Sequence, residues 1–193
     1  MEAFLVSTGL VALAEIGDKT QLLAFLLAAR FRKPLPICLG ILIATVVNHA
    51  CAGALGAWIT TQLSPQLLRW SLGLGFLAMA AWTLVPDKLD AQEEGGGRLK
   101  LGVLGTTIVA FFLAEMGDKT QIATVAMAAQ FKAFWAVVAG TTLGMMIANV
   151  PAVLLGDRLA GRIPVRLVHG IAAVIFLALG LAVLSGLGEG RLF

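Results

Sequence analysis

Charge is scarce in this sequence, and its scarcity excludes an ordinary soluble domain. Of the 193 residues, 13% are charged and 59% are hydrophobic, whereas soluble domains hold roughly 25% charged and about 45–50% apolar residues. The formal net charge of +3 is small and dispersed, so the chain offers no basic surface for nucleic acid. We therefore expect one domain that is embedded in a lipid bilayer and has no nucleic-acid partner.

Cysteine is rare, tyrosine is absent, and the common motifs of hydrolases are missing. Cys38 and Cys51 lie in one apolar segment, where a helix separates them by about 20 Å, so they cannot pair within the chain. The sequence has no Cys/His cluster and no HExxH or GxSxG motif. We expect a protein that is not an enzyme and that has no resident cofactor.

Long apolar segments are abundant instead. Six of them reach or approach the ~20 residues that cross about 30 Å of hydrocarbon. They cover residues 3–29, 35–59, 67–86, 102–130, 133–156 and 165–187. The first has no basic leader and continues past the length of a cleavable signal peptide, so it is expected to be a span. The polar stretch 87–100 is expected to be a cytosolic linker between residues 1–86 and 101–193.

The two halves repeat one another at a constant offset of 100 residues. Ala-Glu-Ile-Gly-Asp-Lys-Thr-Gln at 14–21 returns as Ala-Glu-Met-Gly-Asp-Lys-Thr-Gln at 114–121. Other matches include Gly40 with Gly140, Gly56 with Gly156, and Phe76 with Phe176. Because each repeat has an odd number of spans, the second half must enter the membrane from the opposite side. The predicted fold is an all-α polytopic membrane protein with six transmembrane helices in two inverted-topology three-helix repeats, as in many secondary transporters.

The distribution of basic residues predicts the orientation. One side of the predicted membrane domain holds Arg30, Arg32, Lys33, Lys88, Arg98, Lys100, Arg158, Arg162 and Arg166, and the other holds Arg69, Lys132 and Arg191. Because the side richer in lysine and arginine faces the cytosol, both termini are expected outside the cytosol. The glycines at 40, 56, 140 and 156 are expected to be packing contacts, and His169 is expected at the membrane interface.

Each octapeptide places charges inside a lipid-spanning segment, where a charge costs about 2.5–3.5 kcal/mol per residue. In a continuous helix, Glu15 and Asp18 share one face, and Lys19 lies close enough to Glu15 to pair with it. Gly17 leaves two conformations open, a close approach of helices or a local break whose carbonyl groups line a cavity. The second copy offers the same set at Glu115, Gly117, Asp118 and Lys119.

Both motifs fall near the middle of their spans, so inverted repeats would bring them together. The predicted metal ligands of the merged site are the four carboxylates Glu15, Asp18, Glu115 and Asp118. With Lys19 and Lys119, they sum to a charge of −2, which a low dielectric does not tolerate. One divalent cation or two protons would neutralise it, and this competition is the physical basis of antiport. An all-oxygen ligand set suits Mn²⁺, Ca²⁺ or Mg²⁺.

Further polar residues are secondary candidates for the same site. They are Lys19, Lys119, Thr20, Thr120, Gln21, Gln121, His49 and Asn149. His49 and Asn149 occupy equivalent places in the two repeats and could line the path of the ion, and His49 could relay protons. They could equally form hydrogen bonds between helices.

The doubled motif resembles a known family. Two E-x-G-D-[KR]-[ST] motifs in a duplicated six-span protein are similar to the divalent cation/proton exchangers of Golgi, chloroplast and bacterial membranes, and this chain shows both motifs, at 15–20 and 115–120, without departure. The resemblance covers essentially the whole chain. It implies transport of Mn²⁺ or Ca²⁺ against protons, with the motif carboxylates as the cation site.

The leading expectation is therefore proton-coupled export of Mn²⁺ from the cytosol across the inner or plasma membrane. The first alternative is a Ca²⁺/proton antiporter, and a homodimer is the assembly considered. An intramembrane aspartyl enzyme is a third reading, although the absence of tyrosine excludes a Tyr-Asp partner motif. A membrane scaffold would tolerate neutral motif replacements, and a passive channel would carry flux that protons cannot drive uphill.

Overall fold

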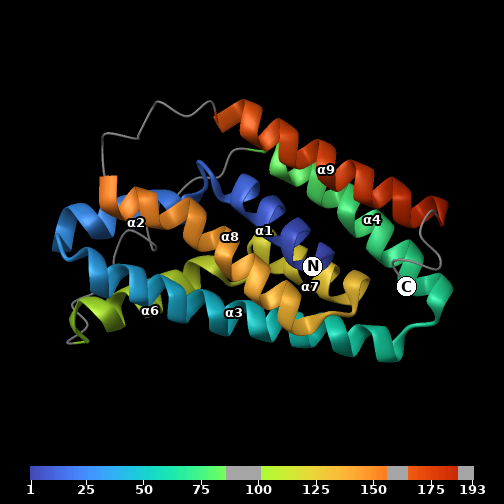
Figure 1. The fold of residues 1–193 in the computed structure, drawn as a ribbon, viewed down its shortest axis with the longest axis horizontal. Coiled ribbons are helices and arrows are strands. Elements are labelled where there is room, and N and C mark those ends of the chain that lie inside the picture. The colour runs from blue at the N-terminus through green and yellow to red at the C-terminus, as the bar shows by residue number, and fades with distance from the viewer. Residues whose placement is uncertain (86–100, 156–164, 187–193) are drawn as a thin grey trace.

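The computed structural model describes residues 1–85, 101–155 and 165–186, and its regular elements there are all α-helices (Figure 1). The first half contains α1 (Glu2–Glu15), α2 (Lys19–Phe31), α3 (Pro34–Gln62) and α4 (Pro65–Thr83). The second half contains α6 (Gly102–Glu115), α7 (Lys119–Phe131), α8 (Phe134–Leu155) and α9 (Val165–Ser185). The all-α prediction is confirmed for these ranges. The predicted linker at 87–100 and Gly156 lie outside the described residues.

Local sequence signals set several helix boundaries, and one kind of helix end recurs at matching places in the two halves. Prolines occupy the first turns of α3 and α4, where a missing N–H costs nothing. The chain leaves α2 at Arg32 and α7 at Lys132, both in the left-handed region with φ of 52° and 49°. At each position the backbone N–H donates to a carbonyl one turn back, that of Ala28 or Ala128. The helices that follow, α3 and α8, therefore start from equivalent turns.

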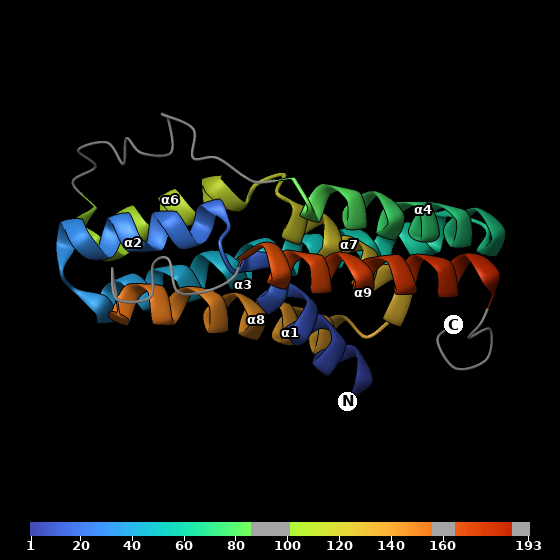
Figure 2. The same ribbon diagram turned by 90° about the horizontal axis from the view of Figure 1, so that it is seen from above.

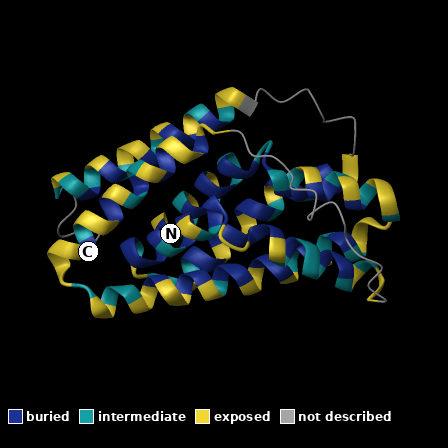
Figure 3. Cartoon of the chain, turned by 180° about the vertical axis from the view of Figure 1, so that it is seen from behind, coloured by how far each residue is buried: buried dark blue, intermediate teal, exposed yellow. Residues whose placement is uncertain are grey.

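Three of the described helices are long and apolar enough to cross a bilayer, judged by length and composition. They are α3, α8 and residues Arg166–Ser185 of α9, and α6 is a shorter apolar helix. The segments expected to be single spans at 3–29 and 102–130 are each divided into two helices. Many large apolar residues are exposed, and Trp135 is 80% exposed. Figure 3 shows the exposed residues in yellow along the helices. A surface of this kind suits lipid rather than water.

Helices of one half pack against helices of the other half, and the same contacts occur in both directions. Helix α1 packs along α8 as α6 packs along α3, and α2 contacts α8 as α7 contacts α3. Helices α4 and α9 lie side by side along one flank, and Figures 1 and 2 show them together at the edge of the molecule. Within this pair, the rings of Phe76 and Phe176 stack with centroids 6.4 Å apart. The two residues occupy equivalent positions in the repeat, so this contact joins matching parts of the two halves.

Gly40, Gly56 and Gly140 allow neighbouring helices to approach closely, as the sequence predicted. A Cβ atom added at Gly40 would lie 2.6 Å from Thr107 Cβ, and one added at Gly140 would lie 2.6 Å from Phe4 O and 3.0 Å from Ser7 Cβ. Residues 4 and 7 are the counterparts of 104 and 107, so the two contacts are equivalent. Gly56 meets the carbonyl of Val125 on α7 in the same way. These contacts hold α1 and α6 against the long helices and thereby position the ends of both at the motifs.

Candidate cation site

Both octapeptides break their helix at the glycine. Helix α1 ends at Glu15 and α2 begins at Lys19, and α6 and α7 are divided identically at Glu115 and Lys119. The φ angles of the two glycines are 85° at Gly17 and 77° at Gly117, a region that only glycine adopts without strain. Of the two conformations left open by the sequence, the structure therefore has the local break. It also corrects the expectation that Glu15 and Asp18 share one helix face, because no continuous helix joins them.

The glutamines of the motifs close each break. Gln21 Oε1 accepts a hydrogen bond from Gly17 N at 2.9 Å, and Gln121 Oε1 accepts one from Gly117 N at 2.8 Å. Gln21 also donates to the carbonyl of Ala148 on α8 at 3.0 Å. These bonds satisfy backbone donors that the missing helical turn leaves without partners. Both glutamines thus hold the backbone of the break rather than pointing a ligand oxygen at an ion.

Each break sets helix ends against the charged side chains in a favourable sense. Asp18 and Asp118 occupy the N-cap positions of α2 and α7, where the helix dipole favours negative charge. Glu15 and Glu115 are the last residues of α1 and α6, and the dipole at the C-terminal end of a helix favours a cation. The partial negative charge at the ends of α1 and α6 therefore favours a cation, and the partial positive charge at the starts of α2 and α7 stabilises the two aspartates.

The lysines pair across the repeats. Lys119 Nζ lies 3.1 Å from Asp18 Oδ1, and Lys19 Nζ lies 3.8 Å from Asp118 Oδ1. The predicted contact of Lys19 with Glu15 relied on a continuous helix, and the break removes that register. The two motifs nevertheless converge, as the sequence predicted.

Three of the four predicted carboxylates form one cluster of oxygen atoms. One carboxylate oxygen from each of Glu15, Asp18 and Asp118 lies within 4.8 Å of the others, and all three residues are buried. Thr20 donates a short hydrogen bond to Glu15 Oε2, and Thr120 Oγ1 donates to Asp118 Oδ2 at 3.3 Å. Oxygen ligands in this number and charge suit a hard divalent cation. Glu115 lies outside this cluster.

Glu115 faces His49 instead. His49 Nε2 on α3 lies 3.7 Å from Glu115 Oε2, and neither side chain has any exposed surface. The equivalent residue, Asn149 on α8, is also buried, and its Nδ2 donates to Met145 O at 3.1 Å. Neighbouring Asn48 donates to Phe112 O at 3.2 Å, which is a hydrogen bond between helices. The equivalent residues His49 and Asn149 thus differ in their contacts, because His49 faces Glu115 and the amide nitrogen of Asn149 donates to its own helix.

His169 lies near the candidate site, although the sequence analysis did not predict it there. His169 on α9 is 7% exposed, and its Nε2 donates to the carbonyl of Ile16 in the first break at 2.8 Å. The sequence placed His169 at the membrane interface and did not predict that its side chain is buried against the first break. The available signal was its equivalence to Arg69, a second polar residue in the corresponding helix of the first half. The bond satisfies a backbone acceptor that the break exposes and ties α9 to it.

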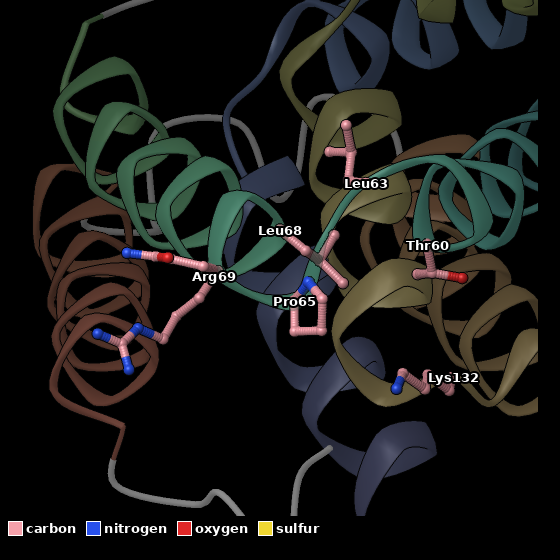
Figure 4. A pocket seen from close by; sticks show the side chains of 7 residues that line it. Thr60, Leu63, Pro65, Leu68, Arg69 and Lys132 are labelled. Carbon is pink, nitrogen blue, oxygen red and sulfur yellow. The ribbon is translucent and has the colours of Figure 1, made fainter.

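A separate cavity of about 600 Å³ lies where α3 ends and α4 begins (Figure 4). It is lined by Thr60, Leu63, Pro65, Gln66, Leu68, Arg69 and Lys132. No motif residue is among them, and the two cations on its wall would repel a metal ion. The motif carboxylates themselves are buried, with exposures of 0% to 5%. The candidate cation site is therefore closed to solvent in this structure.

Known proteins match the chain over nearly its full length. The profile of the family described as "Divalent cation/proton antiporter GDT1" matches residues 3–91 and 103–189. A Vibrio cholerae protein named "Putative manganese exporter" is 50% identical over 183 residues, which are 94% of this chain and 90% of that protein. A Synechocystis GDT1-like protein is 32% identical, with 91% of this chain and 93% of that protein covered.

More distant relatives extend the same match to eukaryotes. The Saccharomyces cerevisiae protein named "Divalent cation/proton antiporter GDT1" is 26% identical over 227 residues, with 91% of this chain and 81% of that protein covered. No solved structure matches the chain significantly. The family is one of transporters and not of enzymes. With two broken helices that bring paired acidic motifs together in a membrane protein, this chain belongs to the GDT1 family of divalent cation/proton antiporters.

Proposed function

We propose that this protein exports Mn²⁺ from the cytosol in exchange for protons, and that both substrates use the carboxylates of the two motifs. The observation that carries the proposal is the reciprocal pairing of Lys119 with Asp18 and of Lys19 with Asp118. These pairs balance two of the four carboxylates. The two glutamates supply the remaining charge of −2, and both are fully buried. A buried surplus of this size needs a neutralising partner.

One dication or two protons provide that neutralisation equally well, and this sets the coupling. Mn²⁺ binds the oxygen cluster of Glu15, Asp18 and Asp118 with Glu115 beside it, and its arrival releases protons from the glutamates. In the reverse step, protonation of the glutamates removes the ligand charge and the metal leaves. The site switches its access from one side of the membrane to the other only when its charge is balanced. After it releases one substrate it must therefore bind the other before it can switch back, and this couples the two fluxes.

The membrane arrangement follows from the same elements. Helices α1 and α2 together form one broken span, and α6 and α7 together form another, which gives six spans in two repeats of opposite orientation. Broken helices at the centre of the membrane are tolerated where the freed backbone lines a polar site. The basic loops then face the cytosol, both termini lie outside it, and the protein resides in the inner membrane.

Reconstituted protein tests the proposal directly. In proteoliposomes, an imposed pH gradient is expected to drive Mn²⁺ against its own gradient, and Glu15→Gln and Glu115→Gln are each expected to reduce this flux at least about tenfold because one ionisable ligand is lost. Glu2→Gln is the matched control, since Glu2 is an exposed carboxylate in the first turn of α1. Undiminished proton-driven flux in both motif variants would refute the proposed site.

Calcium exchange is the second candidate, and the oxygen cluster is the observation that favours it. Three carboxylate oxygens within 4.8 Å suit Ca²⁺ as well as Mn²⁺. The same liposomes, loaded with Ca²⁺ in place of Mn²⁺, separate the two substrates by the ratio of their proton-driven rates. A higher rate for Ca²⁺ under matched concentrations would reverse the assignment of the substrate and leave the mechanism in place.

A further inference from the structure

A buried imidazole and a buried carboxylate face each other beside the oxygen cluster, and neither group is satisfied. His49 Nε2 and Glu115 Oε2 are 3.7 Å apart, with both side chains fully buried. Within the described part of the chain, neither ring nitrogen of His49 and neither carboxylate oxygen of Glu115 has a hydrogen-bond partner. A buried polar group left in this state costs about 1–3 kcal/mol. Four such atoms at one place point to a ligand.

The spacing of the two groups fits a shared metal ion better than a hydrogen bond. At 3.7 Å, the nitrogen and oxygen are too far apart to bond directly. Two ligands of one dication, each about 2.0–2.2 Å from the ion, lie roughly 3–4 Å apart. The pair thus has the separation of neighbouring ligands before any movement of the backbone.

The two halves of the site differ, because the counterparts of His49 and Glu115 at the offset of 100 residues are Asn149 and Glu15. Asn149 takes the place of His49, and its amide nitrogen donates to its own helix at 3.1 Å. In the first repeat, Glu15 accepts a hydrogen bond from Thr20, whereas Thr120 donates to Asp118 at 3.3 Å. Glu115 is therefore the motif glutamate that keeps both oxygens available, and it is the one that faces an imidazole.

We propose that His49 and Glu115 form a nitrogen-containing binding position for a transition-metal dication, next to the oxygen cluster of Glu15, Asp18 and Asp118. The inference rests on the proposed function and adds the basis of its selectivity. Oxygen ligands suit Ca²⁺, Mg²⁺ and Mn²⁺ alike. Mn²⁺ is a first-row transition metal, so imidazole nitrogen is a ligand that it accepts more readily than the hard cations Ca²⁺ and Mg²⁺ do. His49 is thus the specificity-determining residue that favours Mn²⁺ over Ca²⁺.

Electron spin echo spectroscopy of bound Mn²⁺ tests the nitrogen ligand in the intact protein. The chain has two histidines, His49 and His169, so labelling histidine with ¹⁵N changes the signal only if one of them binds the metal. Purified wild-type protein with one equivalent of Mn²⁺ is expected to show coupling to a directly bound nitrogen that shifts on labelling. His49→Gln is expected to abolish the coupling, and His169→Gln is expected to keep it.

A competition measurement provides the second readout. His49→Gln is expected to lower the preference of the protein for Mn²⁺ over Ca²⁺ by about tenfold, which corresponds to about 1.4 kcal/mol. His49→Asn, which copies the residue of the second repeat, is expected to do the same and serves if the glutamine variant does not fold. An unchanged preference in a folded variant contradicts the role of His49.

The outcomes separate this inference from the proposed function. Bound Mn²⁺ that shows only oxygen ligands in the wild-type protein overturns the nitrogen position and leaves the carboxylate site intact. Nitrogen coupling that persists in folded His49→Gln overturns it equally. A wild-type protein that binds no Mn²⁺ at all, although it is folded, contradicts the proposed function as well.

Discussion

Lys119 Nζ lies 3.1 Å from Asp18 Oδ1, and both side chains are fully removed from solvent. The two residues come from the same motif in opposite halves of the chain, so the motifs are joined by an ion pair and not merely adjacent. The reverse pair, Lys19 with Asp118, is longer at 3.8 Å, and its lysine side chain is 17% exposed. The junction between the repeats is therefore unequal, and its tighter half is buried more deeply.

Removing the buried lysine is expected to destabilise the protein strongly. Lys119→Met leaves the carboxylate of Asp18 without its buried counter-ion, a change that costs about 3–5 kcal/mol when one partner of a buried pair is lost. Lys19→Met is expected to cost less, because the longer pair is partly solvated. Thermal unfolding of the protein in detergent, followed by circular dichroism, measures both changes.

The double variant Lys119→Met with Asp18→Asn provides the control for this prediction. It removes both charges, so most of the lost stability is expected to return even though transport does not. Lys33→Met, at an exposed lysine, is expected to change stability by no more than about 0.5 kcal/mol. A double variant as unstable as Lys119→Met alone would show that packing, and not charge, explains the loss.

The meeting of the two motifs could be predicted from the sequence, whereas their geometry could not. The octapeptide repeat and the span lengths are visible in the letters, and inverted repeats bring residues at equal depth together. The helix break is not visible, because Gly17 reads the same in a helix and at φ of 85°. The spacing rule for neighbours on one continuous helix therefore paired Lys19 with Glu15. The actual partner, Asp118, comes from the other repeat, and the sequence does not show where the two repeats make contact.

The inequality of the two glutamates was also beyond the sequence. Both motifs are written alike, and the threonine that follows each aspartate has the same spacing. Thr20 nevertheless donates to Glu15 while Thr120 donates to Asp118, and identical letters cannot show this difference. The difference between His49 and Asn149 was visible as a mismatch at equivalent places, and only the structure places His49 against Glu115.

Alanine at the second break is expected to cost about 1–2 kcal/mol through backbone strain alone. Gly117 has φ of 77°, and a Cβ atom added there would meet nothing within 4 Å. Gly117→Ala therefore tests the left-handed conformation without a steric clash. Gly9→Ala is the matched control, because Gly9 is equally open but lies within α1, where alanine is the better helix former. Equal stability changes in the two variants, measured by thermal unfolding, would contradict the break.

Loss of the imidazole of His169 is expected to loosen the first break selectively. His169→Leu leaves the Ile16 carbonyl without its donor and is expected to cost about 1–3 kcal/mol. His169→Gln, which can still donate from a similar position, is expected to recover part of this. Hydrogen exchange of the amides at 16–22 measures the effect locally. Exchange that rises equally in α4 and α8 would indicate general destabilisation and not a broken contact.

Acid is expected to weaken metal binding, with a slope that counts the exchangeable protons. Metal binds the deprotonated carboxylates, so falling pH raises the apparent Kd for Mn²⁺, and each proton displaced contributes up to about tenfold per pH unit. The surplus charge of −2 sets a limiting slope of two in the wild-type protein. Glu115→Gln removes one of the two exchangeable groups and is expected to reduce the limiting slope to one, whereas Glu2→Gln leaves it at two. Equilibrium binding of Mn²⁺ across the pH range gives both slopes, and a slope of two in Glu115→Gln would place the second proton on a group other than that glutamate.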